Sequence, residues 1–278
     1  MRAIARLLLT VLIVSLLVPT SLYAWAWTQD AGHGQIILTA SFFQTSRSFD
    51  DRGNPKRFAD DASFRQLMLN PFLEYGMSTR NTLVVNANIP FLRYASSQGI
   101  VRSAGLGDVE IGLKRRLNSP ESKWALSCQV AVMFPAYPDS RVPAPGNHQE
   151  DIEGRMMAGR GATLLMRHAF WAVEGAFRYR NGAPSDQARA EASVGADLNR
   201  RLTVMAQFFA IKSLRNGTPL TMTSNPNSQS DFDLYKYQPS VVYRLSHTTL
   251  VQFGANSTFC GRNAGRGLAP MFALWQRF

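Results

Sequence analysis

The feature that most constrains this chain is an alternation of apolar and polar side chains that recurs in segments of about ten residues. In the stretch TLVVNANIPF, Leu83, Val85 and Ile89 fall on one side of an extended chain. Asn86 and Asn88 fall on the other side. Successive side chains of a β-strand point to opposite faces, so this spacing predicts strands with one apolar and one polar face. Helical periodicity is missing, and the sequence therefore predicts an all-β fold.

About twelve segments show this pattern, which predicts a single domain rather than a mixture of folds. They cover residues 34–44, 64–75, 82–94, 108–118, 123–134, 153–166, 170–181, 188–199, 202–213, 233–245, 248–260 and 267–278. If the boundaries slip, the same pattern would fit ten or fourteen strands.

The connections between these segments alternate in length. Short ones, such as GMSTRN, NSPES and RR, follow every second segment, whereas long polar ones cover 45–63, 135–151 and 214–232. A soluble sandwich has no reason to sort its loops in this way. An outer-membrane barrel does, since its periplasmic turns are short, its outer loops are long and its apolar face meets lipid. We therefore predict an antiparallel transmembrane β-barrel of about twelve strands.

The N-terminus predicts export. Arg2 and Arg6 precede an apolar run over residues 7–18, and Ala24-Trp25-Ala26 provides a small-residue cleavage site. The sequence predicts a leader over residues 1–26 and a barrel over 27–278, with a cut before Trp25 as the alternative. The predicted location is the outer membrane of a Gram-negative-type bacterium.

The two ends of the chain and its charge suggest partners. Phe278, the last residue of an amphipathic segment, resembles the signal that the outer-membrane insertion machinery recognises, although Gln276 departs from the usual apolar residue. The net charge is +11. Because export argues against nucleic acid, this excess favours outer-membrane lipid and lipopolysaccharide as partners, with polysaccharide-export proteins as a further candidate.

The polar faces of the segments predict the lining of the barrel lumen. One interpretation is a charged passage that selects solutes, and the other is ion pairing that fills a narrow interior. The predicted lining residues are Glu74, Asn86, Asn88, Asp108, Glu110, Lys114, Arg116, Glu174, Arg178, Arg189, Glu191, Asp197, Lys236, Gln238 and Arg244.

The sequence predicts no catalytic residue, cofactor site or metal site. Gly105 and Gly107 precede a strand rather than the helix that a nucleotide-binding loop needs. The four histidines lack the His-x-Ser spacing of outer-membrane phospholipases. Strand parity places Cys128 outside and Cys260 inside, so a disulfide between them is not expected.

Two stretches carry a family resemblance. AWTQDAGHGQIILT, residues 26–39, resembles the start of the mature XagA-like exported proteins. GLGDVEIGLKRRLN, residues 105–118, resembles a motif of the wider transporter-like barrels labelled "MetA-pathway of phenol degradation". The resemblance implies an outer-membrane barrel. It associates the first group with surface polysaccharide biosynthesis and the second with uptake of small, often apolar compounds.

These observations leave three functions open. The first is a transport-type barrel, either a narrow passive channel for small solutes or an accessory in surface polysaccharide export. The second is a closed barrel that scaffolds envelope, exopolysaccharide or biofilm machinery. The third, a lipid-modifying enzyme, has the least support because no catalytic constellation is present in the sequence.

Overall fold

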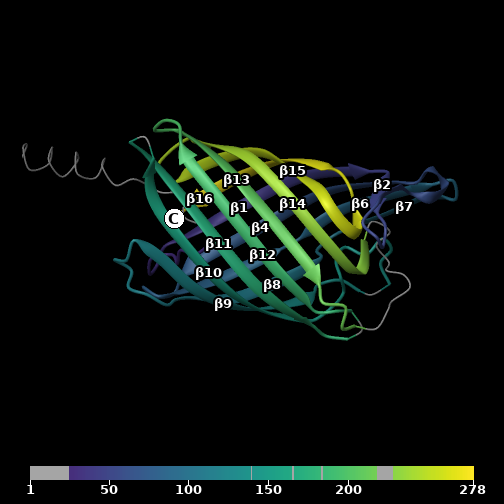
Figure 1. The fold of residues 1–278 in the computed structure, drawn as a ribbon, viewed down its shortest axis with the longest axis horizontal. Coiled ribbons are helices and arrows are strands. Elements are labelled where there is room, and N and C mark those ends of the chain that lie inside the picture. Colours follow the sequence, from purple (N-terminus) through teal and green to yellow (C-terminus); the bar gives the residue numbers. More distant parts are fainter. Residues whose placement is uncertain (1–24, 139, 165, 183, 218–227) are drawn as a thin grey trace, which may run out of the picture.

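The computed structural model describes residues 25–138, 140–164, 166–182, 184–217 and 228–278. Their strands form a closed antiparallel barrel with twelve strand positions (Figure 1), which confirms the predicted fold class. The barrel strands are β1 (Gly34–Thr45), β4 (Ser63–Gly76), β5 (Asn81–Ala87), β6 (Ile89–Ser96), β7 (Gly99–Ala104), β8 (Asp108–Arg116), β9 (Trp124–Pro135), β10 (Asp151–Leu164), β11 (Arg167–Arg180), β12 (Gln187–Asp197), β13 (Leu202–Ser213), β14 (Ser228–Arg244), β15 (Thr249–Gly265) and β16 (Leu268–Arg277).

The barrel closes through β1, which pairs with β4 on one side and with β16 on the other. Gly34 and Phe278 also exchange two backbone hydrogen bonds, of 2.9 and 3.0 Å. Two strand positions are each built from a pair of strands, β5 with β6 and β7 with β8, because the ladder is interrupted near Asn88 and near Gly105. Closure leaves no long unpaired edge, which a lipid environment requires.

The two ends of the barrel differ. The start of β1 and the end of β16 lie at one end of the barrel, which we call the turn end. The short connections 77–80, 117–123, 198–201 and 245–248 lie at the same end. The opposite end, the loop end, carries the hairpin of β2 (Arg47–Phe49) and β3 (Pro55–Arg57) and the hairpin of β6 and β7 (Figure 1). The helical element of the described residues is the short 3-10 turn η1 (Ala59–Asp61), and none of them forms a helix able to cross a membrane.

Apolar side chains cover the outside of the wall. On β8 and β9, Leu113 and Val130 are 49% and 61% exposed, while their inward neighbours Lys114 and Gln129 are buried. Other strands repeat this arrangement with exposed Ile36, Leu38, Leu67, Ile152, Met156, Val173, Phe177, Val194, Phe208, Tyr237, Val241, Phe253, Phe272 and Leu274. An exterior of this kind favours lipid over water as its surroundings.

Two predicted loops contain strands. Between the predicted segments 82–94 and 108–118, the chain continues the ladder through Ser96 and returns along β7, which pairs with β6. Gly99, with a φ of +135°, permits the tight reversal. The connection 45–63 likewise contains β2 and β3, and β2 pairs with the end of β15. Polar composition does not distinguish such extramembrane hairpins from loops.

The predicted inward direction of Cys260 is wrong. Lys236 pairs with Thr258, yet the next outward residue, Tyr235, pairs with Cys260, so Phe259 is an extra residue in β15. This bulge shifts the parity of the strand by one residue and places Cys260 on the exposed outer face. Cys128 and Cys260 are both free thiols.

Candidate functional site: the barrel lumen

Three adjoining hollows lie in the part of the lumen that the described residues form. The central hollow, about 340 Å³, is lined by residues from nearly every barrel strand, among them Glu74, Lys114 and Glu191. The side hollow, about 220 Å³, shares Glu174, Glu191 and Gln238 with it. The loop-side hollow, about 270 Å³, shares Leu234, Lys236 and Asn256 with the side hollow. Because neighbouring hollows share lining residues, they lie in a row from the middle of the barrel toward the loop end.

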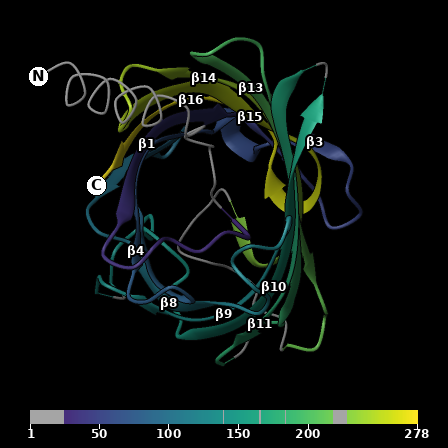
Figure 2. The same cartoon turned by 90° about the vertical axis from the view of Figure 1, so that its left-hand side faces the viewer.

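The chain ahead of β1 enters this lumen. We call residues 25–33 the N-terminal segment; Figure 2, a view from the turn end, shows it inside the ring of strands. Trp25 donates its indole N–H to Glu191 on β12 at 2.7 Å, and its carbonyl accepts a 2.7 Å hydrogen bond from Lys114 on β8. Ser127 on β9 donates to the carbonyl of Ala26, which is fully buried. The segment is thus bound by opposite walls of the barrel.

Aromatic packing and a glycine complete this contact. The rings of Trp25 and Trp27 lie 6.1 and 6.4 Å from that of Phe170 on β11, the first stacked and the second edge-on. A Cβ built on Gly159 of β10 would lie 2.7 Å from the ring of Trp27. Only a glycine at that position leaves room for the tryptophan. The N-terminal segment is therefore fitted to the wall by shape as well as by hydrogen bonds.

The side chain of Gln29 fixes the segment to the opposite wall. Its amide donates to Glu74 on β4 at 2.8 Å, and its backbone N–H donates to Thr82 on β5 at 2.9 Å. Glu74 also accepts hydrogen bonds from Gln35 and from Lys114, with which it forms a buried ion pair. The carboxylate of Glu74 thus has three donors, and burial of its charge is compensated.

A fourth hollow, about 570 Å³, lies at the turn end. Trp27 lines it, whereas Trp25 lines the central hollow. Its other walls include Arg116, Lys123 and Arg160, so it has a basic lining. The N-terminal segment therefore contacts two hollows, the central one and a basic one at the turn end, which we call the turn-end chamber.

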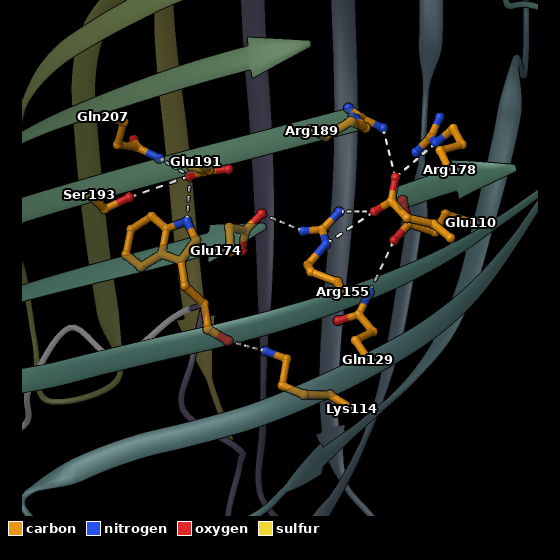
Figure 3. A network of polar contacts seen from close by, with 12 residues as sticks. Glu110, Lys114, Gln129, Arg155, Glu174, Arg178, Arg189, Glu191, Ser193 and Gln207 are labelled. Atoms are coloured by element: carbon orange, nitrogen blue, oxygen red, sulfur yellow. Dashed lines mark hydrogen bonds and ion pairs between the residues drawn. The ribbon is translucent and has the colours of Figure 1, made fainter. Parts of the chain in front are cut away.

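An ion-pair network covers the wall formed by β10, β11 and β12 (Figure 3). Its centre is Glu153, whose side chain is 1% exposed and which accepts from Arg155 at 2.5 Å, Arg178 at 2.8 Å and Arg189 at 3.1 Å. Arg155 also pairs with Glu174 at 2.8 Å. Pairing of this kind was one of the two interpretations of the inward charges, and here it occupies one wall without filling the hollows.

Most of the predicted lining residues border these hollows. The central one is bordered by Glu74, Asn86, Glu110, Lys114, Glu174, Glu191 and Gln238; the side one is also bordered by Arg189 and Lys236, and Arg116 borders the turn-end chamber. Arg178 belongs to the network of Glu153, and Asn88 accepts a 3.0 Å hydrogen bond from Asn70. That these residues contact a passing solute stays a prediction.

Asp108, Asp197 and Arg244 have local structural partners. Asp108, at the start of β8, accepts from the backbone N–H of Asn147 at 2.8 Å. Asp197 accepts from the hydroxyl of Thr203 at 2.6 Å, and Arg244 donates to the carbonyl of Arg200 at 3.3 Å. These contacts lie toward the two ends of the barrel and tie connections to the wall.

The connection 136–150 folds against the loop end. Arg141 bonds to the carbonyl of Ala104, and the rings of Tyr137 and His148 lie 5.1 Å apart. Burial, together with the nearby charge of Asp108, raises the pKa of the Tyr137 hydroxyl. This connection therefore packs on the start of β8.

The N-terminal segment is the part of the site that strand patterning missed. Its residues have no alternation, and a predicted leader ending at Ala26 would remove Trp25 and Ala26 altogether. The one available signal was the presence of two tryptophans in a Gly- and Asp-containing stretch that belongs to no strand. Buried tryptophans of this kind usually find a partner for the indole N–H, as Trp25 does with Glu191.

Comparison with solved structures supports the architecture. An outer membrane channel from Pseudomonas putida F1 superposes with a TM-score of 0.63 at 14% identity, covering 90% of this chain and 97% of the other. The NanC porin superposes with a TM-score of 0.54 at 8% identity, covering 87% and 98%. No protein-family model matches the sequence, and no curated protein matches it. At these identities the likeness shows the fold, which is that of bacterial outer-membrane β-barrels.

Proposed function

We propose that this protein is a passive outer-membrane channel for small solutes whose turn end is constricted by its own N-terminal segment. The observation that carries this proposal is the row of adjoining hollows, lined by both polar and apolar side chains, inside a barrel with an apolar exterior. A barrel whose interior is filled by ion pairs would not contain such a row of hollows. A lumen that admits solutes would.

The size of the hollows favours small solutes over polymers. The three hollows have volumes of about 220, 270 and 340 Å³, which lie around the lower limit of about 300 Å³ for typical ligand pockets. A polysaccharide chain would require the N-terminal segment to leave the lumen first. The resemblance to XagA-like proteins keeps an accessory role in surface polysaccharide export as the wider form of the proposal.

The location and processing of the chain belong to the same proposal. The match of the fold to outer-membrane barrels and the terminal Phe278, which is exposed on the outer face, support delivery to the outer membrane by the insertion machinery. Lipid and lipopolysaccharide are then its surroundings. Residues 1–24 of the predicted leader lie outside the described residues.

The contacts of Trp25 and Ala26 support the shorter leader, cut before Trp25. A cut before Trp27 would remove the bond to Glu191, both carbonyl contacts of residues 25 and 26, and the stacking on Phe170. A cut before Trp25 retains all of them. The intact mass of the purified mature protein distinguishes the two positions directly.

Single-channel recording of the refolded mature chain in planar bilayers tests the channel. We expect small ion-conducting steps, and a shift toward cation selectivity in Arg116→Glu, since Arg116 borders the turn-end chamber. Arg115→Glu is the matched control because Arg115 is the neighbouring residue and is exposed. Heat-modifiable mobility establishes that each variant is folded.

A closed scaffolding barrel is the second candidate, favoured by the N-terminal segment itself. The segment contacts β4, β5, β8, β9 and β12 and so lies across the lumen. If a folded chain that lacks residues 25–29 is also electrically silent, the channel proposal fails. Capture of an envelope partner through the loop end would then support the scaffold.

A further inference from the structure

We propose that Lys236 forms a binding site for the carboxylate of a small amphipathic acid, in the loop half of the lumen. The inference deepens the proposed function because it names a substrate class for the same lumen. Lys236 borders both the side hollow and the loop-side hollow, so its side chain is within reach of a solute in either of them.

Lys236 is a cation without a counter-charge. It lies on β14, where its cross-strand neighbours are Phe209 and Thr258. Among the described residues, none forms a hydrogen bond or ion pair with its ammonium group, and the charge that acts on it is the like charge of Arg189. A cation in a partly enclosed site gains from an added anion, because its pairing there is screened less than at an open surface.

The acids that share the side hollow are already engaged. Glu174 pairs with Arg155, and Glu191 accepts hydrogen bonds from Trp25 and from Gln207. The single ion pair of Arg189 within the described residues joins it to Glu153 through one guanidinium nitrogen. Its other N–H groups can share an incoming carboxylate with Lys236, since a guanidinium has five donors.

The walls around Lys236 are apolar, which makes a wholly polar anion a poor fit. In the side hollow they include Phe209, Ile211 and Leu234, and in the loop-side hollow they include Phe43 and Phe232. A pocket with mostly apolar walls and one fixed charge orients an amphipathic ligand. The carboxylate would lie at Lys236 and the apolar part would lie against either aromatic wall.

Binding of 4-fluorobenzoate, followed by fluorine NMR with the folded full-length mature chain in nanodiscs, tests this site. We expect saturable line broadening by the wild type and a loss of affinity of about tenfold or more in Lys236→Gln, as expected when a charged partner is removed. Lys212→Gln is the matched control, since Lys212 is half exposed and pairs with Asp233 near the loop end. The neutral analogue 4-fluorobenzamide should bind at least tenfold more weakly than the acid.

Equal broadening of the acid and the amide, or unchanged affinity in Lys236→Gln, would overturn the inference. The test does not depend on ion flow. Binding by an electrically silent barrel would support this site while the channel proposal fails. Conductance without saturable binding of the acid would leave the channel and remove the site.

Discussion

The two halves of the lumen are polar in different ways. In the turn half, the chain uses its own N-terminal segment, whose carbonyl groups and indole satisfy Lys114, Ser127 and Glu191 across the barrel. In the loop half, neighbouring strands satisfy one another, as in the network around Glu153, and the space in front of them stays hollow. The N-terminal segment belongs to no strand, so its displacement would break no strand pairing. The network around Glu153 belongs to the strands of the wall themselves.

This difference predicts where function and stability separate. Changes in the turn half should alter the passage of ions while the barrel stays folded. Changes in the network around Glu153 should weaken the barrel itself. The predictions below test this division in order of decreasing effect.

The largest effect on stability is expected for Glu153→Gln. It leaves Arg155, Arg178 and Arg189 without their shared carboxylate, and we expect unfolding free energy to fall by about 3 kcal/mol. This figure is at the low end for buried pairs because the arginines stay partly exposed. Urea titration of the folded barrel, followed by heat-modifiable mobility, measures it. A change under ~1 kcal/mol would contradict a structural role for the network.

Gly159→Ala should displace the N-terminal segment. The new Cβ would lie 2.7 Å from the ring of Trp27, an overlap that costs the closed arrangement roughly 1–3 kcal/mol. We expect larger or more frequent current steps. Gly154→Ala, on the same strand, is the matched control because nothing lies within 4 Å of its Cβ position. Indistinguishable currents from the two variants would argue against a segment seated on β10.

Trp25→Phe removes the indole donor and keeps an aromatic ring beside Phe170. Loss of a hydrogen bond to the carboxylate of Glu191 should weaken attachment of the segment by about 1.5 kcal/mol, which corresponds to a roughly tenfold rise in its released population. Proteolysis near the N-terminus of the folded protein reports that population. The rate should stay unchanged in Trp124→Phe, whose ring lies at the turn-end edge of β9.

The smallest effect is expected for Lys212→Gln. Lys212 is half exposed, and its 2.7 Å ion pair with Asp233 is accompanied by a second donor, Arg262. A surface pair of this kind contributes less than ~1 kcal/mol. The same urea titration should therefore place this variant close to wild type. A loss comparable with that of Glu153→Gln would show that the loop end contributes more to stability than its exposure indicates.

The wall of the barrel could be predicted from the sequence because a two-residue period is a local property of each strand. The alternation of the segment TLVVNANIPF can be seen in the sequence alone. Its pairing with β4 and β8 adds only its position in the barrel. The bulge at Phe259 could not be predicted in this way, since one extra residue changes direction without changing composition. The hairpin of β6 and β7 was missed because it lies beyond the apolar belt.

The site depended on contacts that are distant in sequence. Trp25 and Glu191 are 166 positions apart, and neither residue carries a local sign of the other. Inward charges such as Glu174 were placed on the polar face by parity, but the pairing of Arg155 with Glu174 required the register of β10 and β11. Periodicity therefore predicts which face of a strand a side chain is on, but the partner of that side chain on another strand is known only from the closed barrel.

The most direct test of the account is single-channel conductance of the refolded mature chain beside the same chain lacking residues 25–29. A matched deletion of the same length from the hairpin of β6 and β7 controls for shortening the chain. The account predicts small steps for the intact chain and its control, and steps several-fold larger for the truncated one. Equal conductance in all three folded barrels would contradict a lumen constricted by its own N-terminal segment.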